Sequence, residues 1–167
     1  MSGRRKNVAI ESFLVVILMI VFSISVAVLI VQGSSTFQKT LEYREREENL
    51  RIAMSYINMA IRQNDGIGVI NFPDPPSGYD MLLQIKHSGK ESGMSTYIYF
   101  KEGQLYECYT DGPLNPQLST AIVPLKGMGL NYDAENAMVT FHYPHTIENE
   151  ATTLEQIISL RTREVAP

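Results

Sequence analysis

Residues 13–31 read Phe13-Leu-Val-Val-Ile-Leu-Met-Ile-Val-Phe-Ser-Ile-Ser-Val-Ala-Val-Leu-Ile-Val31. From Ser12 to Val31 there is no charged residue, and fifteen of the twenty residues are Leu, Ile, Val or Phe. A helix rises about 1.5 Å per residue, so twenty residues span roughly 30 Å, the hydrocarbon thickness of a bilayer. We therefore expect one transmembrane helix over residues 12–32, which excludes a wholly soluble protein. The residues that we expect to define this span are Phe13, Leu14, Ile17, Ile20, Phe22, Ile24, Val28 and Ile30.

The charges on the two sides of this span predict its orientation. Residues 1–11 form a basic tip in which Arg4, Arg5 and Lys6 outweigh Glu11, and residues 1–32 together carry +2. The rest of the chain carries −6, within a total of −4. Because positive residues beside a first span favour the cytoplasmic side, we expect a cytoplasmic N-terminus and an extracytoplasmic C-terminal part. An acidic exterior also disfavours nucleic-acid binding, which requires clustered Lys and Arg.

A cleaved signal peptide is the alternative to an anchor. Signal peptides have about 7 to 15 apolar residues before a small-residue cleavage site, whereas this run is longer and Val31-Gln-Gly-Ser34 fits that site poorly. The sequence therefore favours an uncleaved anchor. Cys108 has no second cysteine to pair with, and we expect it to be buried, with a reactive thiol or intermolecular bridge as the alternative.

The sequence of residues 33–65 predicts a helical stalk whose C-terminal part is amphipathic. Mixed charges fill residues 42–48, and Asp65-Gly66 supplies a helix stop in which the glycine adopts a left-handed conformation. Gly33 leaves open one bent helix or two helices. Four apolar residues at helical spacing form a stripe expected to pack on a sheet: Leu50, Met54, Ile57 and Ile61.

Residues 66–167 predict an antiparallel β ectodomain, because strand-like runs follow one another through short loops. Hairpins are expected at Lys101-Glu-Gly103 and at Asp133-Ala-Glu-Asn136. The stripe would cover one face of an antiparallel sheet, giving an α+β fold, and Pro124 and Pro144 would mark strand edges or ends. The expected strands are 68–72, 81–87, 94–101, 104–110, 120–125, 127–132, 137–143 and 154–162.

The order of these parts resembles that of type IV pilins and minor pseudopilins. The resemblance rests on Ile10-Glu11 before the apolar run, on the hairpin Thr96-Tyr-Ile-Tyr-Phe-Lys-Glu-Gly-Gln-Leu-Tyr106, and on Leu130-Asn-Tyr132 and Leu154-Glu-Gln-Ile-Ile-Ser-Leu-Arg161. With Ala53-Met-Ser-Tyr-Ile57, Arg62-Gln-Asn-Asp65 and the same hairpin, the chain also resembles a domain-of-unknown-function family of short single-pass proteins from Gram-positive bacteria. The second resemblance implies the topology and leaves the activity open.

The N-terminal tip departs from the pilin pattern. Pilin precursors are cut after a Gly five residues before the glutamate, and that place here is Lys6, with Gly3 the nearest glycine. If the tip is cut, Glu11 is a candidate assembly contact that neutralises the new amino terminus of an adjoining subunit. If it is retained, Glu11 is a residue at the headgroup boundary beside Arg4 and Arg5.

The sequence offers few residues for catalysis, and no cofactor is expected. His142-Tyr-Pro-His145 lacks the cysteines of a zinc set, and Glu148 and Glu150 fall in an expected polar loop over residues 146–153. No nucleotide-binding or nucleophile motif occurs, so we do not expect an enzyme. The remaining candidates are four tyrosines of one hairpin, explained either by cross-strand packing or by an exposed contact face: Tyr97, Tyr99, Tyr106 and Tyr109.

These observations predict a membrane-anchored pilin-like or pseudopilin-like structural or assembly protein. Its partners would be the lipid bilayer and pilin-like subunits or secretion machinery. The alternative is an anchored extracytoplasmic binding module that recruits an exported partner without forming a filament.

Overall fold

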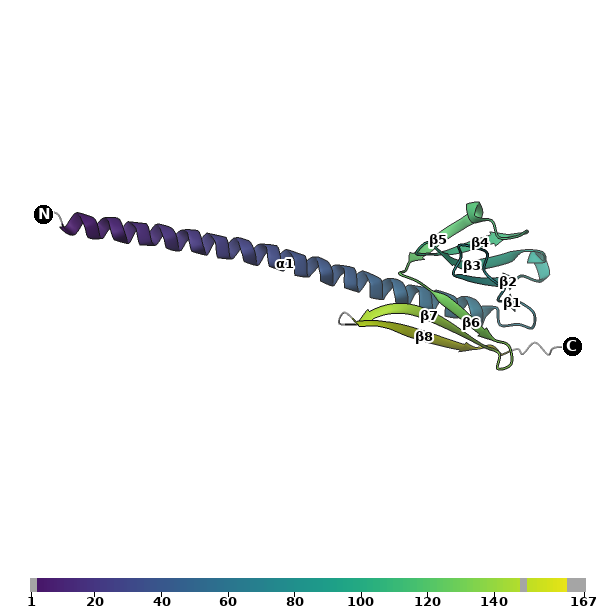
Figure 1. Cartoon of the computed structure of the whole chain (residues 1–167). Helices are drawn as coiled ribbons and strands as arrows, with labels where there is room; N and C mark the ends of the chain where they lie inside the picture. Colours follow the sequence, from purple (N-terminus) through teal and green to yellow (C-terminus); the bar gives the residue numbers. More distant parts are fainter. Residues whose placement is uncertain (1–2, 148–149, 162–167) are drawn as a thin grey trace. The chain divides into compact units, whose positions relative to one another are not determined.

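The computed structural model describes residues 3–147 and 150–161, with side chains for residues 13–145 and 151–161. Among these described residues, one long helix precedes eight antiparallel strands, so the fold is α+β. Figure 1 shows the order of these elements. The chain divides into two compact units, Met1–Glu45 and Arg46–Pro167. The elements are α1 (Gly3–Gln63), β1 (Ile70–Asn71), β2 (Met81–Lys86), η1 (Gly89–Glu91), β3 (Ser95–Lys101), β4 (Gln104–Thr110), η2 (Pro116–Leu118), β5 (Ser119–Pro124), β6 (Gly129–Asp133), β7 (Met138–Ile147) and β8 (Glu150–Ser159).

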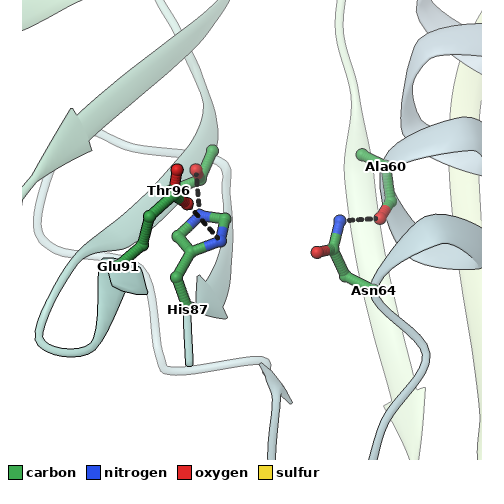
Figure 2. A network of polar contacts seen from close by, with 5 residues as sticks. All are labelled: Ala60, Asn64, His87, Glu91 and Thr96. Atoms are coloured by element: carbon green, nitrogen blue, oxygen red, sulfur yellow. Dashed lines mark hydrogen bonds and ion pairs between the residues drawn. The ribbon is translucent and has the colours of Figure 1, made fainter. Parts of the chain in front are cut away.

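The helix α1 is one element and has no break at Gly33, so the two-helix alternative is wrong. The helix ends at Gln63, close to the expected end. The left-handed conformation expected at Gly66 is wrong, because Gly66 has no positive φ, whereas Gly68 does. Instead, Asn64 Nδ2 donates to the carbonyl oxygen of Ala60 at 2.8 Å (Figure 2). A side-chain amide therefore satisfies a terminal carbonyl group without a left-handed residue at position 66.

The first five strands form a sheet of order β1-β2-β3-β4-β5 in which all pairs are antiparallel. The hairpin between β3 and β4 pairs Lys101 with Gln104, which leaves a two-residue turn at Glu102 and Gly103. Both turn residues have positive φ, 50° and 77°, as type I′ turns require. The hairpin predicted at Lys101-Glu-Gly103 is confirmed.

The last three strands form a separate sheet of order β6-β7-β8. The turn between β6 and β7 is organised by Asp133, whose Oδ1 accepts from the backbone N–H of Glu135 and Asn136. Its Oδ2 accepts from Asn136 Nδ2 at 2.7 Å. These hydrogen bonds hold the pKa of Asp133 below its usual range, with the side chain of Asn136 the largest cause. The second predicted hairpin is thereby confirmed.

The polar loop expected over residues 146–153 is wrong for most of its length. Strands β7 and β8 continue pairing past Pro144, with His145 opposite Thr152 and Ile147 opposite Glu150. The β-branched residues at these positions favour strand, and Pro144 is tolerated because it lies beyond the part of β7 that pairs with β6. Glu150 therefore begins β8, and Glu148 lies outside the described residues.

The core of the second unit joins the end of α1 to both sheets. Leu50, Ile57 and Ile61 are buried, and Met54 is partly buried against the same cluster. Side chains of β2 and β3, such as Leu83 and Ile98, contribute from one sheet, and Val139 and Phe141 of β7 contribute from the other. The last turns of α1 are seen beside both sheets in Figure 1. Both sheets therefore pack against the helix stripe, whereas the sequence predicted a single sheet.

Candidate functional site

The residues predicted to cross a membrane lie on a part of α1 that is apolar on every side. Every large apolar side chain from Phe13 to Val31 is exposed, including all eight that we singled out as the span. A helix apolar all round belongs in a protein core or in lipid, and this stretch has no protein around it among the described residues. By length and composition, α1 contains one stretch able to cross a membrane.

The two serines within this stretch are satisfied inside the helix. Ser23 Oγ donates to Met19 O, and Ser25 Oγ donates to Val21 O, both at 2.8 Å. Polar groups in hydrocarbon are costly when they lack a partner, and a bond to the backbone four residues earlier removes that cost. The serines are therefore compatible with a lipid environment.

The topology residues lie where only the backbone is described. Arg4, Arg5, Lys6 and Glu11 fall within α1, but their side chains are outside the described residues. The predicted contact of Glu11 therefore lies outside the described side chains, and its two predicted roles stay open.

The four hairpin tyrosines do not share one face. Tyr99 stands opposite Tyr106, and Tyr97 opposite Cys108, so these residues lie on the face turned away from α1. Tyr99 is 2 % exposed, burial raises its pKa, and its ring stacks on Tyr106 with centroids 5.2 Å apart. Tyr109 stands on the other face and is 45 % exposed. Tyr99 therefore belongs to a packed cluster, and Tyr109 is separate from it.

Cys108 belongs to the same cluster. Its side chain is fully buried, and its Sγ lies 3.3 Å from the carbonyl oxygen of Asn115, to which the thiol donates. This position agrees with a small packed residue and provides no solvent access for thiol chemistry.

Each histidine lies beside a glutamate. His87 Nδ1 is 3.7 Å from Glu91 Oε2, and its Nε2 is 2.8 Å from Thr96 Oγ1. Figure 2 draws the three side chains together. The other two pairs are His142 with Glu155 at 3.3 Å and His145 with Glu47 at 3.2 Å. The pairs are separate, and across the described residues no three metal-ligating side chains gather.

A pocket that the sequence did not predict lies where the two sheets meet the end of α1. Its volume is about 400 Å³. The lining comes from the loop after α1, from β1 and the two residues after it, from β2, from β6 and from the residue after β8. These residues are Asp65, Gly66, Gly68, Ile70, Asn71, Phe72, Pro73, Gln84, Tyr132 and Leu160. No local pattern could have revealed it, because its walls are up to 95 residues apart in sequence, from Asp65 to Leu160.

The pocket combines aromatic rings with amide and carboxylate groups. Phe72 and Tyr132 stack with centroids 4.5 Å apart. Asp65 Oδ2 accepts from the backbone N–H of Arg161 at 2.8 Å, which ties the segment after β8 to the end of α1. Asn71 Nδ2 is buried and has no hydrogen-bond partner. An unpaired buried donor costs about 1 to 3 kcal/mol, so this amide is a local cost to the fold.

Residues 48–145 match the model of a family described as a domain of unknown function, DUF4860. The chain belongs to this family. The DUF4860 segment begins in the last third of α1 and ends in β7, so it includes every pocket residue except Leu160 and leaves the apolar residues 13–31 outside. No curated protein matches the DUF4860 chain. No solved structure matches it.

Proposed function

We propose that this DUF4860 protein is a single-pass membrane protein with a cytoplasmic N-terminus, and that it acts as a pilin-like or pseudopilin-like structural or assembly subunit of a bacterial secretion or pilus-type system. One observation carries the proposal: the apolar surface of residues 13–31 extends around the whole helix. The internal hydrogen bonds of Ser23 and Ser25 support the same environment. The basic tip supports the orientation, and the pilin-like order of parts supports the role.

Extraction of membrane vesicles with carbonate tests the anchor. The full chain should stay in the membrane pellet, and Ile20→Arg should release a large fraction, because arginine at the centre of a span costs about 2.5 to 3.5 kcal/mol. Ile157→Arg is the matched control, since Ile157 is exposed on β8 outside the span. A wild-type chain that washes free would overturn the anchor. Protease protection in sealed vesicles tests the orientation, and an ectodomain cut only from the cytoplasmic side would overturn it.

Disulfide crosslinking distinguishes a filament subunit from an anchored protein whose membrane helix does not associate with others. In a Cys108→Ala background, Leu18→Cys should form disulfide-linked oligomers in membranes if apolar helices pack against one another. Ile157→Cys, exposed on β8, should stay monomeric. Intact mass of the membrane-extracted chain shows whether residues 1–6 are removed, which the pairing role of Glu11 requires.

An anchored extracytoplasmic binding module is the second candidate. The pocket beside β1 favours it, because a filament subunit does not need a cavity lined by carboxylate, amide and aromatic groups. Absence of Leu18→Cys oligomers together with retention of residues 1–6 would favour this candidate over the pilin-like one.

A further inference from the structure

The loop between β1 and β2 carries an exposed run of prolines. It reads Pro73-Asp-Pro-Pro-Ser-Gly78, and all of these residues are exposed. A proline ring fixes φ at about −65°, and a residue before a proline is held in the extended or polyproline II region. Residues 73–76, called the proline segment below, are therefore restricted to a polyproline II conformation. Because this helix has about three residues per turn, Pro73 and Pro76 lie on the same edge of the segment.

Both ends of the proline segment are held by turns and packed rings. Tyr79 N–H donates to Pro76 O at 3.0 Å, and Gly78 has a φ of 85°, as the third residue of a type II turn requires. The ring of Tyr79 then lies 5.2 Å from that of Tyr99. At the other end, Phe72 stacks on the tyrosine of β6 at 4.5 Å. The segment is thus held in one conformation, so a partner that binds it orders little additional chain.

A second Pro-x-x-Pro segment of the chain, Pro113-Leu-Asn-Pro116, differs from the first. Pro116 begins η2, and Asn115 Oδ1 caps this helix by accepting from the backbone N–H of Gln117 at 3.0 Å. Leu114 is partly buried against the tyrosine cluster of the first sheet. The second segment is therefore helical and partly packed, whereas the proline segment lies outside every helix and strand and is exposed throughout.

The chemistry of the proline segment restricts what can bind it. Its prolines have no backbone N–H, so it cannot pair as a full strand, but its rings are apolar and its carbonyl groups accept hydrogen bonds. Grooves lined by aromatic side chains bind such segments, because tyrosine and tryptophan offer both an apolar ring and a donor. Asp74 is the only charged residue from Phe72 to Tyr79, which favours a basic residue at the rim of the groove.

We propose that the proline segment is a docking ligand for a partner protein whose groove is lined by tyrosine or tryptophan and rimmed by a basic residue. The rings of Pro73 and Pro76 pack between the aromatic side chains, and the basic residue pairs with Asp74. This assignment deepens the proposed function by naming the class of partner. It rests on that function only for the side of the membrane on which the partner lies.

Site-specific photocrosslinking in cell envelopes of the source organism tests the docking. The full chain carries Ser77→p-benzoylphenylalanine, in the exposed turn directly after the proline segment, which leaves Asp74 in place. Irradiation should give a discrete band heavier than the chain. Mass spectrometry should place a tyrosine or tryptophan of the partner beside the crosslink. The matched site is Glu135→p-benzoylphenylalanine, exposed in the β6–β7 turn, which should give no such band.

A free peptide and two double variants tie the band to the proline rings. Acetyl-Phe-Pro-Asp-Pro-Pro-Ser-Gly-amide at about 1 mM should reduce the band at least about fivefold, whereas the same peptide with alanine at its three proline positions should not. A segment that only stiffens the connection between β1 and β2 would not respond to the free peptide. Pro73→Ala with Pro76→Ala in the chain should reduce the band about tenfold. Pro113→Ala with Pro116→Ala is the matched control and should leave the band unchanged.

Four results would overturn the proposal. These are no heavier band from position 77, a band that contains only a second copy of this chain, an adduct with lipid alone, or a band that the free peptide and the variant of both segment prolines leave unchanged. The carbonate extraction reports the membrane anchor separately. Failure of the docking is therefore distinct from failure of the anchor.

Discussion

Replacing Ile57 by alanine measures how far the end of α1 holds the second unit together. Ile57 is 0 % exposed and lies in the cluster that joins α1 to both sheets. The substitution removes the equivalent of three methylene groups, about 2.4 kcal/mol at 0.8 kcal/mol each. The cavity that remains adds to this, so we expect a loss of about 3 to 4 kcal/mol in the free energy of unfolding.

Ile52 provides the matched control, because it lies on the same helix and is 43 % exposed. Ile52→Ala makes the same chemical change where little burial is lost, and alanine has the higher helix propensity, so we expect a change within about 0.5 kcal/mol. Any general effect of alanine on helix stability is common to both variants. The difference between them therefore isolates the burial of Ile57.

Urea unfolding of the full chain in non-ionic micelles, followed by near-ultraviolet circular dichroism, gives both values. The chain has nine tyrosines and no tryptophan, and all the tyrosines except Tyr43 lie after residue 45, so the signal reports packing in the second unit. Equal losses for Ile57→Ala and Ile52→Ala would refute the packing of the helix stripe against the sheets. A loss below about 1 kcal/mol for Ile57→Ala would refute it too.

Three further predictions test other parts of the second unit. The carboxyl of Asp133 should titrate below the usual aspartate range by NMR, and Asn136→Ala should raise its pKa. Because the pKa is lower in the folded chain, this carboxylate stabilises the fold above its unfolded pKa and loses that effect as pH falls through its folded pKa. An unchanged Asp133 pKa in Asn136→Ala would contradict the turn. Burial raises the pKa of Tyr143, so its phenol should resist ionisation in an ultraviolet titration. Because the unfolded phenol ionises more readily, the fold should lose stability as pH rises above about 10. Ionisation of Tyr143 near pH 10 without unfolding would contradict its burial. Cys108 should react with a thiol reagent only after unfolding, and rapid labelling of the native chain would contradict its burial.

The sequence could predict the elements that local chemistry specifies. The run from Phe13 to Val31 is apolar in every direction, so no tertiary information is needed to recognise a span-length helix. Glu102-Gly103 has turn residues between two aromatic strands, and the structure places both in left-handed conformations. The helix stripe follows from spacing alone, and three of its four residues are buried.

Other features depended on choices that the local sequence leaves open. Asp65-Gly66 has the composition of a helix stop, but the side-chain amide of Asn64 already donates to the carbonyl oxygen of Ala60 in the last turn. Thr152 and Thr153 lie in a polar stretch that suggests a loop, yet their β-branched side chains continue β8 once β7 provides a partner. Pairing across ten residues of each strand outweighs local polarity, and only the tertiary structure reveals it.

The division of the strands into two sheets explains both the missed site and its location. A single meander of eight strands would place β6 beside β5, and a helix would then cover one continuous face. Here β5 and β6 belong to separate sheets, and the pocket is lined by β1, β2, the loop after α1 and Tyr132 of β6. Side chains from both sheets therefore converge there without closing the space, which leaves the pocket beside the edge strand β1. A binding site at this point costs the core little, because Ile57, Phe100 and Phe141 are packed away from it along α1 and both sheets.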